Sequence, residues 1–438
     1  MTAVSEHPAP PPVVHSGSFR RIAGLAAPLV LSNVVLLGAQ VAVTGVIGRM
    51  GDAALYIRSV YAPVALLLLA VTTGLSVTVQ VVVARCVGRG DERSVGANLG
   101  SAARIGVLLA LLVGGVIVGL SGVLAALVEV PPEHAGTFRA FLAAMAAANV
   151  LGILGELTAA VLRGTGLGLP SALLTGCYVT LNLSIVIVFS GAGLMIVPVA
   201  SALAGAVELT AGILLLGARG IRPTGRRPDV LRLLGPVGVP VGASFFLLFA
   251  VNLLLLRIVA PAGETAVAGF SIAYTVQTFV IVPAVGFGSA TAVLMNQRLA
   301  AGQEAMTVLR RGTLVVAGCY ACVTLAVVGF GRPLMGLLSP NRDIVEHATR
   351  FITVVGPTFG ATALMIALVT VLEQIGHGPA AVALNVSYFA VMIAVGEWVV
   401  TGTDVHPLYV TMAVAALASL VTGLPIAWSL AVRKARQP

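Results

Sequence analysis

The stretch GETAVAGFSIAYTVQTFVIVPAVGFGSATAVLMNQRLAAGQ (residues 263–303) decides the fold class of this chain. Between Glu264 and Arg298 it carries no charged side chain. A helix needs about 20 apolar residues to cross ~30 Å of hydrocarbon. This segment is long enough to span a bilayer, so the first question is whether the rest of the chain is built in the same way.

The composition answers that question. Hydrophobic residues make up 58% of the 438 residues, charged residues 9%, and the mean hydropathy is +1.05. A soluble domain carries roughly a quarter charged residues, so this chain must lie largely in lipid. Long Ala, Val, Leu and Gly runs favour helices, because the strands of a membrane barrel would show ~10-residue alternating segments. We therefore expect an all-α polytopic membrane protein.

Glycine, proline and charge punctuate the apolar runs and predict twelve transmembrane helices. The expected spans are 22–47, 55–84, 98–122, 138–162, 170–190, 193–217, 234–260, 266–297, 311–336, 350–373, 379–401 and 407–431. The Pro-rich residues 1–19 lack the pattern of a secretory signal. We expect them to form a disordered cytoplasmic tail.

Positive charge predicts the orientation in the membrane. Most of the 25 basic residues fall in the N-tail, alternate loops and the C-tail. The exceptions are Arg49, Arg58, Arg139, Arg257, Arg332, Arg342 and Arg350. The positive-inside rule then places both termini in the cytoplasm. Arginine is used at every basic position except Lys434, which suggests a bacterial genome and a plasma (inner) membrane.

The two halves of the chain resemble each other. At an offset of 212 residues GDAALYIRSV (51–60) matches GETAVAGFSI (263–272), and at an offset of 210 LRGTGLG (162–168) matches LEQIGHG (372–378). Six spans in each half make the repeats parallel, with a pseudo-twofold axis along the membrane normal. We expect an N-lobe at 20–217 (helices 1–6), a cytoplasmic linker at 218–233, a C-lobe at 234–431 (helices 7–12) and a cytoplasmic tail at 432–438.

Several segments of the chain resemble a known family. The residues that carry the resemblance are IGRMGDAALYIRSV (47–60), ARCVGRGDERS (84–94), LRGTGLGLP (162–170) and the segment 263–303. These are similar to the multidrug and toxic compound extrusion (MATE) family, over about residues 20–431. The resemblance implies a twelve-helix antiporter that expels amphipathic, often cationic, compounds in exchange for protons or sodium.

The chain departs from the pattern of that family at its usual ion-coupling positions. Many members have an acid near the end of span 1, where this sequence has Ala42 and Val43. In span 5, Asn182 matches the family's first polar position, but the second holds Ser184, Ile185 or Val186. Proton coupling and sodium coupling therefore both stay open.

Four carboxylates lie inside the expected spans: Glu156, Glu208, Glu373 and Glu397. An ionised carboxylate at the bilayer centre costs about 2.5–3.5 kcal/mol on insertion scales, so it needs water, a partner or a proton. At 1.5 Å per residue Glu208 lies ~16 Å from the end of its span and Glu156 ~10 Å, whereas Glu397 lies near the outer end. Glu156, Glu208 and Glu373 are the candidates for proton or cation coupling.

Glu373 has a second interpretation. The repeat places it opposite Arg163, at the cytoplasmic end of span 10. There we expect it foremost to be a charge at a helix end in the membrane interface. A structural contact inside one lobe is likewise the alternative for Glu156 and Glu208.

Uncharged polar side chains mark helix faces that could line a substrate site. A cavity for amphipathic cations combines apolar walls, a few hydrogen-bond acceptors and aromatic surfaces. The candidates for substrate binding are Asn33, Gln40, Asn149, Asn182, Asn252, Tyr274, Gln277 and Tyr388.

These features predict a secondary active exporter of amphipathic or cationic small molecules that works by proton-coupled antiport through rocking of two lobes. A single titrating carboxylate favours protons over sodium, although a sodium gradient stays open as the energy source. A flippase for a lipid-linked oligosaccharide is the alternative, although no arginine cluster lies in the middle of the spans. An intramembrane enzyme is a weaker one, since no Asp lies in any span. We expect no cofactor and no metal site. We also expect no nucleic-acid partner, because the basic residues behind the net charge of +9 lie in short loops between the spans. A monomer in the lipid bilayer is expected.

Overall fold

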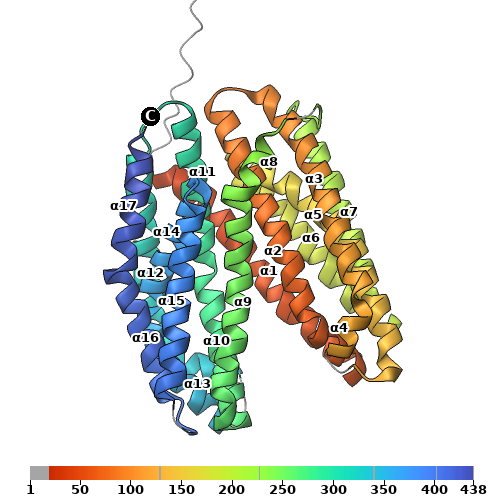
Figure 1. The fold of residues 1–438 in the computed structure, drawn as a ribbon, viewed down its shortest axis with the longest axis vertical. Helices are drawn as coiled ribbons and strands as arrows, with labels where there is room; N and C mark the ends of the chain where they lie inside the picture. The colour runs from red at the N-terminus through yellow and green to blue at the C-terminus, as the bar shows by residue number, and fades with distance from the viewer. Residues whose placement is uncertain (1–18, 128–129, 226, 339–340, 401, 438) are drawn as a thin grey trace, which may run out of the picture.

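The computed structural model is built of helices throughout the residues it describes, which are 19–127, 130–225, 227–338, 341–400 and 402–437 (Figure 1). Within these residues, twelve helical segments are long and apolar enough to cross a membrane. This confirms the predicted all-α fold with twelve transmembrane spans. The expected N-terminal tail lies outside the described residues except for Phe19, where the first helix begins.

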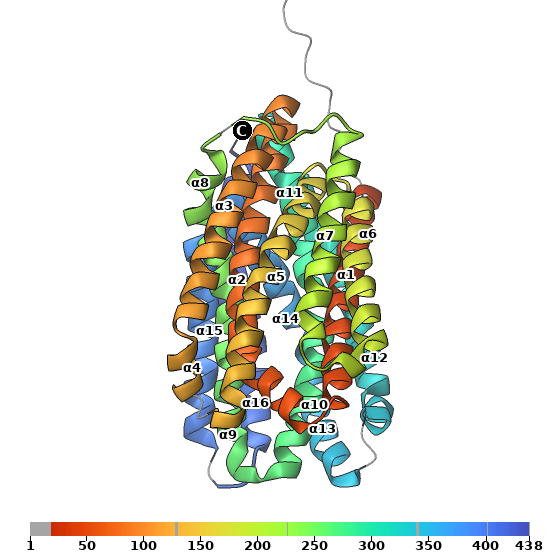
Figure 2. The ribbon, with the colours of Figure 1, turned by 90° about the vertical axis from the view of Figure 1, so that its right-hand side faces the viewer.

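The N-lobe contains the first six spans. Its helices are α1 (Phe19–Gly48), α2 (Asp52–Gly88), α3 (Glu92–Gly119), the short α4 (Ser121–Leu127), α5 (Pro132–Gly164), α6 (Gly168–Val188) and α7 (Ile196–Gly217). Figure 2 looks onto this lobe and shows α5 between α3 and α7. The α5 helix therefore has neighbours on both sides, and its side chains are held by packing.

The C-lobe contains the other six spans, several of which are broken into two helices. Its helices are α9 (Val239–Val259), α10 (Glu264–Ile281), α11 (Pro283–Ala300), α12 (Met306–Leu338), α13 (Arg342–Val355), α14 (Phe359–Ile375), α15 (Gly378–Val399), α16 (His406–Val421) and α17 (Gly423–Ala435). Proline has no N–H and clashes with the preceding turn. Breaks accordingly fall at Pro283 and at the 3₁₀ turn Gly356–Thr358, which contains Pro357.

The segment between the lobes packs on the N-lobe. It includes α8 (Asp229–Leu233) and a π-helical turn at Leu234–Gly238 that leads into α9. Its Thr224 N–H donates to the Gly96 carbonyl at 3.2 Å, and its Arg227 N–H donates to Ser101 Oγ at 2.8 Å. The expected linker 218–233 is thus held against α3 rather than extended into solvent.

The lobes meet mainly through α1 and α2 on one side and α9 and α11 on the other. The contact is tightest near the ends of α2 and α11, where a Cβ on Gly88 would lie 2.1 Å from the Gln297 carbonyl oxygen. Toward the opposite end the two lobes diverge (Figure 1). We call the end that holds the α2–α3 turn, the α11–α12 turn and the C terminus the basic end.

Candidate functional site

The centre of the N-lobe contains an ion pair within α5. Arg163 pairs with Glu156, two turns earlier on the same helix. Ser76 Oγ of α2 donates to Glu156 Oε1 at 2.7 Å. The Arg163 side chain is 13% exposed and that of Glu156 28%. Residues seven positions apart lie on one face of a helix, and here the two side chains neutralise each other.

Arg163 is also the centre of a larger hydrogen-bond network. Its guanidinium donates to Ser76 Oγ at 2.7 Å, to Gln80 Oε1 at 3.0 Å and to Ser171 Oγ at 3.3 Å. A guanidinium has five N–H donors in a rigid fork, and here α2, α5 and α6 share them. Arg163 therefore fixes the position of Gln80 as well as that of Glu156.

Gln80 carries this network across the boundary between the lobes. Its Nε2 donates to Ser289 Oγ of α11 at 2.7 Å and to Gln374 Oε1 of α14 at 3.0 Å. All three side chains are buried. A single amide thus accepts from the N-lobe arginine and donates to the C-lobe.

Two further hydrogen bonds join the lobes nearer the basic end. Arg85 Nε of α2 donates to Asn296 Oδ1 of α11 at 3.0 Å, and Gln297 Nε2 donates to the Gly164 carbonyl at 3.0 Å. Asn296 is held in turn by the Gln374 carbonyl at 3.0 Å. The basic end of the interface is closed by polar contacts between buried groups.

Glu208 of α7 lies beside this network but outside it. Its side chain is only 4% exposed. It fills the space next to Gly155 of α5, where a Cβ would lie 2.7 Å from Glu208 Oε2. The charged groups close enough to interact electrostatically with its carboxyl are Glu156 and Arg163. Within the described ranges, no hydrogen bond or ion pair reaches its carboxyl, which is costly for a buried polar group.

Glu373 of α14 lies in the C-lobe. It is 5% exposed and accepts a hydrogen bond from Ser244 Oγ of α9 at 2.6 Å. Asn385 of α15 donates to the same Ser244 oxygen at 3.0 Å. Glu373 is in the last turn of α14, as expected for a helix-end charge, but its side chain is buried and bonded to α9 instead of lying exposed in the membrane interface.

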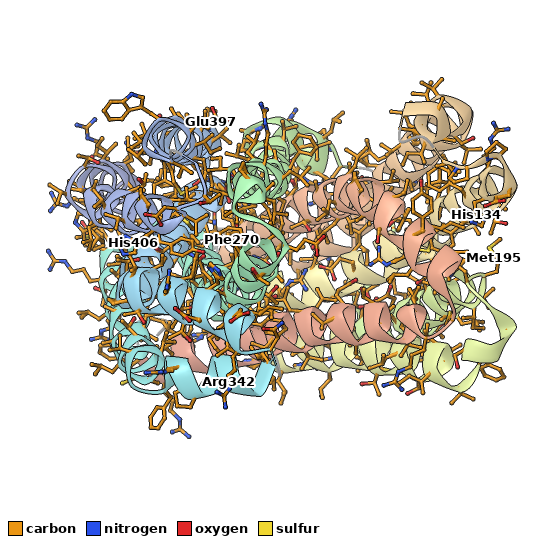
Figure 3. All side chains as sticks on the ribbon, turned by 90° about the horizontal axis from the view of Figure 1, so that it is seen from below. His134, Met195, Phe270, Arg342, Glu397 and His406 are labelled. Carbon is orange, nitrogen blue, oxygen red and sulfur yellow. The ribbon has the colours of Figure 1, made fainter. Side chains whose placement is uncertain are left out.

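Glu397 occupies a different setting from the other three span carboxylates. It is exposed on α15 at the rim of the C-lobe, as Figure 3 shows in a view from the end opposite the basic end. His134 and Met195 mark the N-lobe at the same end (Figure 3). The position near the outer end that the sequence predicted for Glu397 fits this placement.

The polar substrate candidates of the N-lobe lie in different parts of the structure. Asn182 Nδ2 of α6 donates to Ser201 Oγ of α7 at 3.1 Å, and Ser201 lies two helical turns before Glu208 on α7. Gln40 is exposed and accepts from Arg58 Nη2 at 3.3 Å. Asn33 and Asn149 are half-buried. Among these candidates, Asn182 is therefore the one that bonds to the helix carrying Glu208.

The C-lobe candidates belong largely to one apolar cluster. Tyr274 of α10 and Tyr388 of α15 pack against the same buried core, and Tyr274 stacks on Phe270 with ring centroids 5.5 Å apart. Gln277 Oε1 is buried with no hydrogen-bond partner among the described residues. Asn252 of α9 is half-buried. This side of the interface is more aromatic and less charged than the N-lobe.

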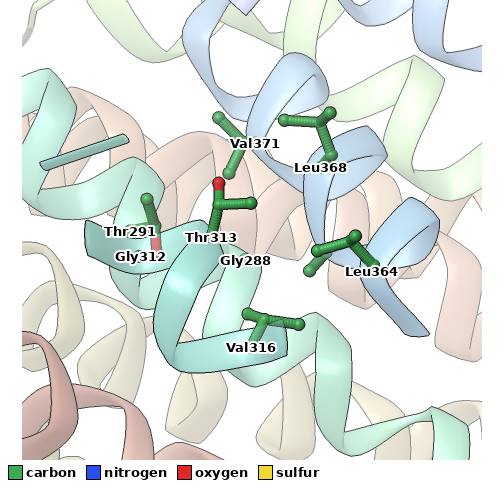
Figure 4. A pocket seen from close by; sticks show the side chains of 9 residues that line it. Gly288, Thr291, Gly312, Thr313, Val316, Leu364, Leu368 and Val371 are labelled. Atoms are coloured by element: carbon green, nitrogen blue, oxygen red, sulfur yellow. The ribbon is translucent and has the colours of Figure 1, made fainter. Parts of the chain in front are cut away.

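A small cavity between α11, α12 and α14 lies apart from these groups (Figure 4). Its volume is about 10 Å³, and its walls include Thr291, Thr313 and Val316. A space of this size holds about one water molecule. It is too small for a transported compound.

Sequence reasoning missed Ser76, Gln80, Ser289 and Gln374 as functional residues. Their signal was present but weak, since each is a polar side chain inside an apolar span and Ser76 and Gln80 are spaced by one helical turn. What the sequence does not show is that Gln80 and Gln374, which are 294 positions apart, meet.

The comparisons with known proteins bear on this arrangement. The family model MatE matches residues 28–210 and 240–399, which contain the spans of both lobes up to α15. The chain belongs to the MatE family. This confirms the resemblance to MATE transporters read from the sequence. MatE proteins form a transporter family, and the matched residues include Gln80, Glu156, Glu208 and Glu373.

Relatives of this MatE chain agree in length and fold. A protein from Deinococcus radiodurans described as a probable multidrug resistance protein NorM is 29% identical over 376 residues, which cover 78% of this chain and 80% of that protein. Among solved structures, the bent form of the Vibrio cholerae MATE transporter VcmN has a TM-score of 0.87 at 18% identity, covering 95% of this chain and 97% of that one. An outward-facing multidrug resistance MATE transporter of the MOP superfamily has a TM-score of 0.86 at 15% identity, with coverage of 96% and 97%. These likenesses show the fold.

Proposed function

We propose that this protein is a secondary active exporter of amphipathic or cationic small molecules and that it is driven by proton antiport. The observation that carries the proposal is Glu208, a carboxyl that is 4% exposed and has no hydrogen bond in the described part of the chain. A neutral, protonated carboxyl tolerates such surroundings better than an ionised one. The relative described as a probable multidrug resistance protein supports the substrate class.

The division of labour between the two N-lobe carboxylates follows from their partners. Arg163 neutralises Glu156, so Glu156 is a structural anchor of the network. Glu208 has no counter-charge of its own and is the group that gains and loses the proton. The nearby guanidinium repels a sodium ion, and sodium prefers several oxygen ligands. Both features favour a proton.

The proposed cycle uses the contact between the lobes. With the basic end open to the cytoplasm, an ionised Glu208 attracts a cationic compound. The lobes then rock, the basic end closes through Gln80 and Arg85, and a proton from outside neutralises Glu208. Loss of that charge weakens the binding of the cation, which leaves on the outer side. In this scheme the protein lies in a bacterial inner membrane, and both of its termini are in the cytoplasm.

The substrate contacts in this proposal are divided between the lobes. Asn182 bonds to α7, the N-lobe helix that carries Glu208, and Tyr274, Gln277 and Tyr388 provide aromatic and polar surface in the C-lobe. Aromatic faces attract cations. An amphipathic cation would lie with its charge toward the N-lobe and its apolar part toward the C-lobe.

Efflux of a fluorescent lipophilic cation from proteoliposomes tests the proposal. A proton gradient and a sodium gradient are imposed separately on the wild type, Glu208→Gln and Glu397→Gln. We expect proton-driven efflux in the wild type and in Glu397→Gln, whose carboxylate is exposed and outside the network, and its loss in Glu208→Gln. If neither gradient drives efflux, the result would instead support the alternative function, a flippase for a lipid-linked oligosaccharide.

A further inference from the structure

The basic end contains a cavity that the transport scheme does not use. Its volume is about 450 Å³, within the usual range for small-ligand sites. The polar walls are Arg85, His377, Arg433, Lys434 and Gln437, and the apolar side is formed by the segment between the lobes, the end of α14 and α17. It lies where α17 ends, beside the C terminus marked in Figure 1.

The cavity is strongly cationic. Arg85, Arg433 and Lys434 carry permanent charges, and none of the residues that line the cavity is acidic. In the described chain, none of these three cations takes part in a salt bridge. Lys434 is also the single lysine of the sequence. Such a group of like charges repels itself unless an anion joins it.

Arg85 is held ready for such an anion. Its Nε is anchored by Asn296 Oδ1 at 3.0 Å, which directs the guanidinium toward the α14–α15 turn. There Nη2 would lie 4.0 Å from a Cβ on Gly376. Within the described residues, no acceptor is bonded to its two terminal nitrogens. An arginine fork of this kind matches the oxygens of a phosphate group.

We propose that this cavity binds the phosphate group of an anionic ligand. The chemistry is shared by two sources, the headgroup of an anionic lipid and a soluble phosphate. Basic pockets between transmembrane helices on the cytoplasmic side suit lipid headgroups, and the cavity opens at the helix ends where such headgroups lie. This site is separate from Glu208 and does not depend on which compound is transported.

The ligand would also favour one state of the protein. Arg85 comes from α2 of the N-lobe, whereas His377, Arg433 and Lys434 come from the C-lobe. The cavity is complete only when the lobes meet at the basic end. A ligand shifts a conformational equilibrium toward the state that it binds more tightly. The phosphate group therefore stabilises the state described here, with the basic end closed.

Thermal stability and retained lipid test the site together. The purified full-length protein is placed in nanodiscs of phosphatidylcholine, either alone, with added inorganic phosphate, or mixed with phosphatidylglycerol. The variant Arg433→Gln/Lys434→Gln removes two cavity charges, and Arg20→Gln/Arg436→Gln removes two exposed charges from the same end outside the cavity. Native mass spectrometry counts the phosphatidylglycerol that stays bound.

A lipid site raises the apparent Tm of the wild type with phosphatidylglycerol but not with inorganic phosphate; a soluble-anion site does the reverse. In either case the cavity variant should bind about thirtyfold more weakly, whereas the control variant keeps the wild-type response. Two results would overturn the proposal: no response of the wild type to either additive, or an equal loss in the control variant. The second would mean that the surface charge acts without a site.

Discussion

Gln80 joins the two lobes through one side-chain amide: its Oε1 accepts from Arg163 Nε at 3.0 Å, and its Nε2 donates to Gln374 Oε1 at 3.0 Å. The first bond lies within the N-lobe and the second crosses to α14. A change in charge at Glu156 or Arg163 thus alters the contact that closes the basic end, because Gln80 bonds to both Arg163 and Gln374.

Replacing Gln80 by leucine should loosen the basic end. The substitution removes the bonds to Ser289 and Gln374 across the boundary and the bond to Arg163 within the N-lobe. A hydrogen bond between such groups contributes about 1 kcal/mol, so the loss of the two crossing bonds should raise the ratio of open to closed protein by roughly thirtyfold. The measurement is the distance between spin labels at Arg89→Cys and Glu304→Cys, with the four native cysteines replaced by serine.

The control for that experiment is Thr72→Val. Thr72 is also a polar residue of α2, but its hydroxyl bonds only to the Leu68 carbonyl of its own helix, at 2.8 Å. We expect unchanged label distances in this variant. If Gln80→Leu also leaves the distances unchanged, the amide bridge does not close the lobes.

Arg163→Met should destabilise the protein more than Glu156→Gln does. Removing the arginine strands a partly buried carboxylate, and breaking a buried pair from one side costs several kcal/mol, less here because Glu156 is 28% exposed. The apparent Tm in detergent should fall by several degrees. The double variant Arg163→Met/Glu156→Gln should recover part of that loss, since it leaves no unpaired charge. Additive losses in the double variant would show that the two side chains are not coupled.

Gly155→Ala should impair transport without unfolding the protein. The new methyl group would lie 2.7 Å from Glu208 Oε2, so the carboxyl must move. Displacing a functional group by about 1 Å commonly costs on the order of tenfold or more in rate. Gly152→Ala is the matched control on the same helix, because a Cβ there meets no atom within 4 Å. Equal transport by both variants would separate Glu208 from the transport step.

The sequence predicts the span carboxylates better than it predicts their surroundings. Glu156 and Glu208 stand out because a charge inside an apolar span is costly and therefore rare. The bond between Gln80 and Gln374 does not stand out in this way, since amides are common in spans and the two residues meet only through lobe packing. Glu373 shows the same limit. Its place in the last turn of its helix follows from hydropathy, whereas its burial depends on contact with Ser244 of α9.

The spans themselves were predictable because a bilayer fixes their length. The predicted span 266–297 corresponds to α10 and α11, which together run from Glu264 to Ala300. The break between them at Pro283 was not predicted. A proline in a span is compatible with a kinked helix or with two helices, and neighbouring segments decide which forms.

His377 should make the protein less stable in acid. Burial first, and the charge of Lys434 second, lower the pKa of His377 below its ordinary value of 6.5. Because the unfolded chain then binds a proton more readily than the folded one, this contribution to stability is present above pH 6.5 and is lost as the pH falls below it. His377→Asn should flatten the dependence of Tm on pH between about 7 and 5 in chloride buffer. His406→Asn, at the opposite end of the C-lobe, should keep the wild-type slope.

Proton release on substrate binding tests the central claim most directly. A lipophilic cation is added to the purified protein in weakly buffered detergent solution, and a pH indicator follows the protons released. If Glu208 exchanges a proton for the cation, the wild type and Glu397→Gln release about one proton per bound cation and Glu208→Gln releases none. Equal release by Glu208→Gln and the wild type would contradict the account, because the exchanged proton would then come from another group.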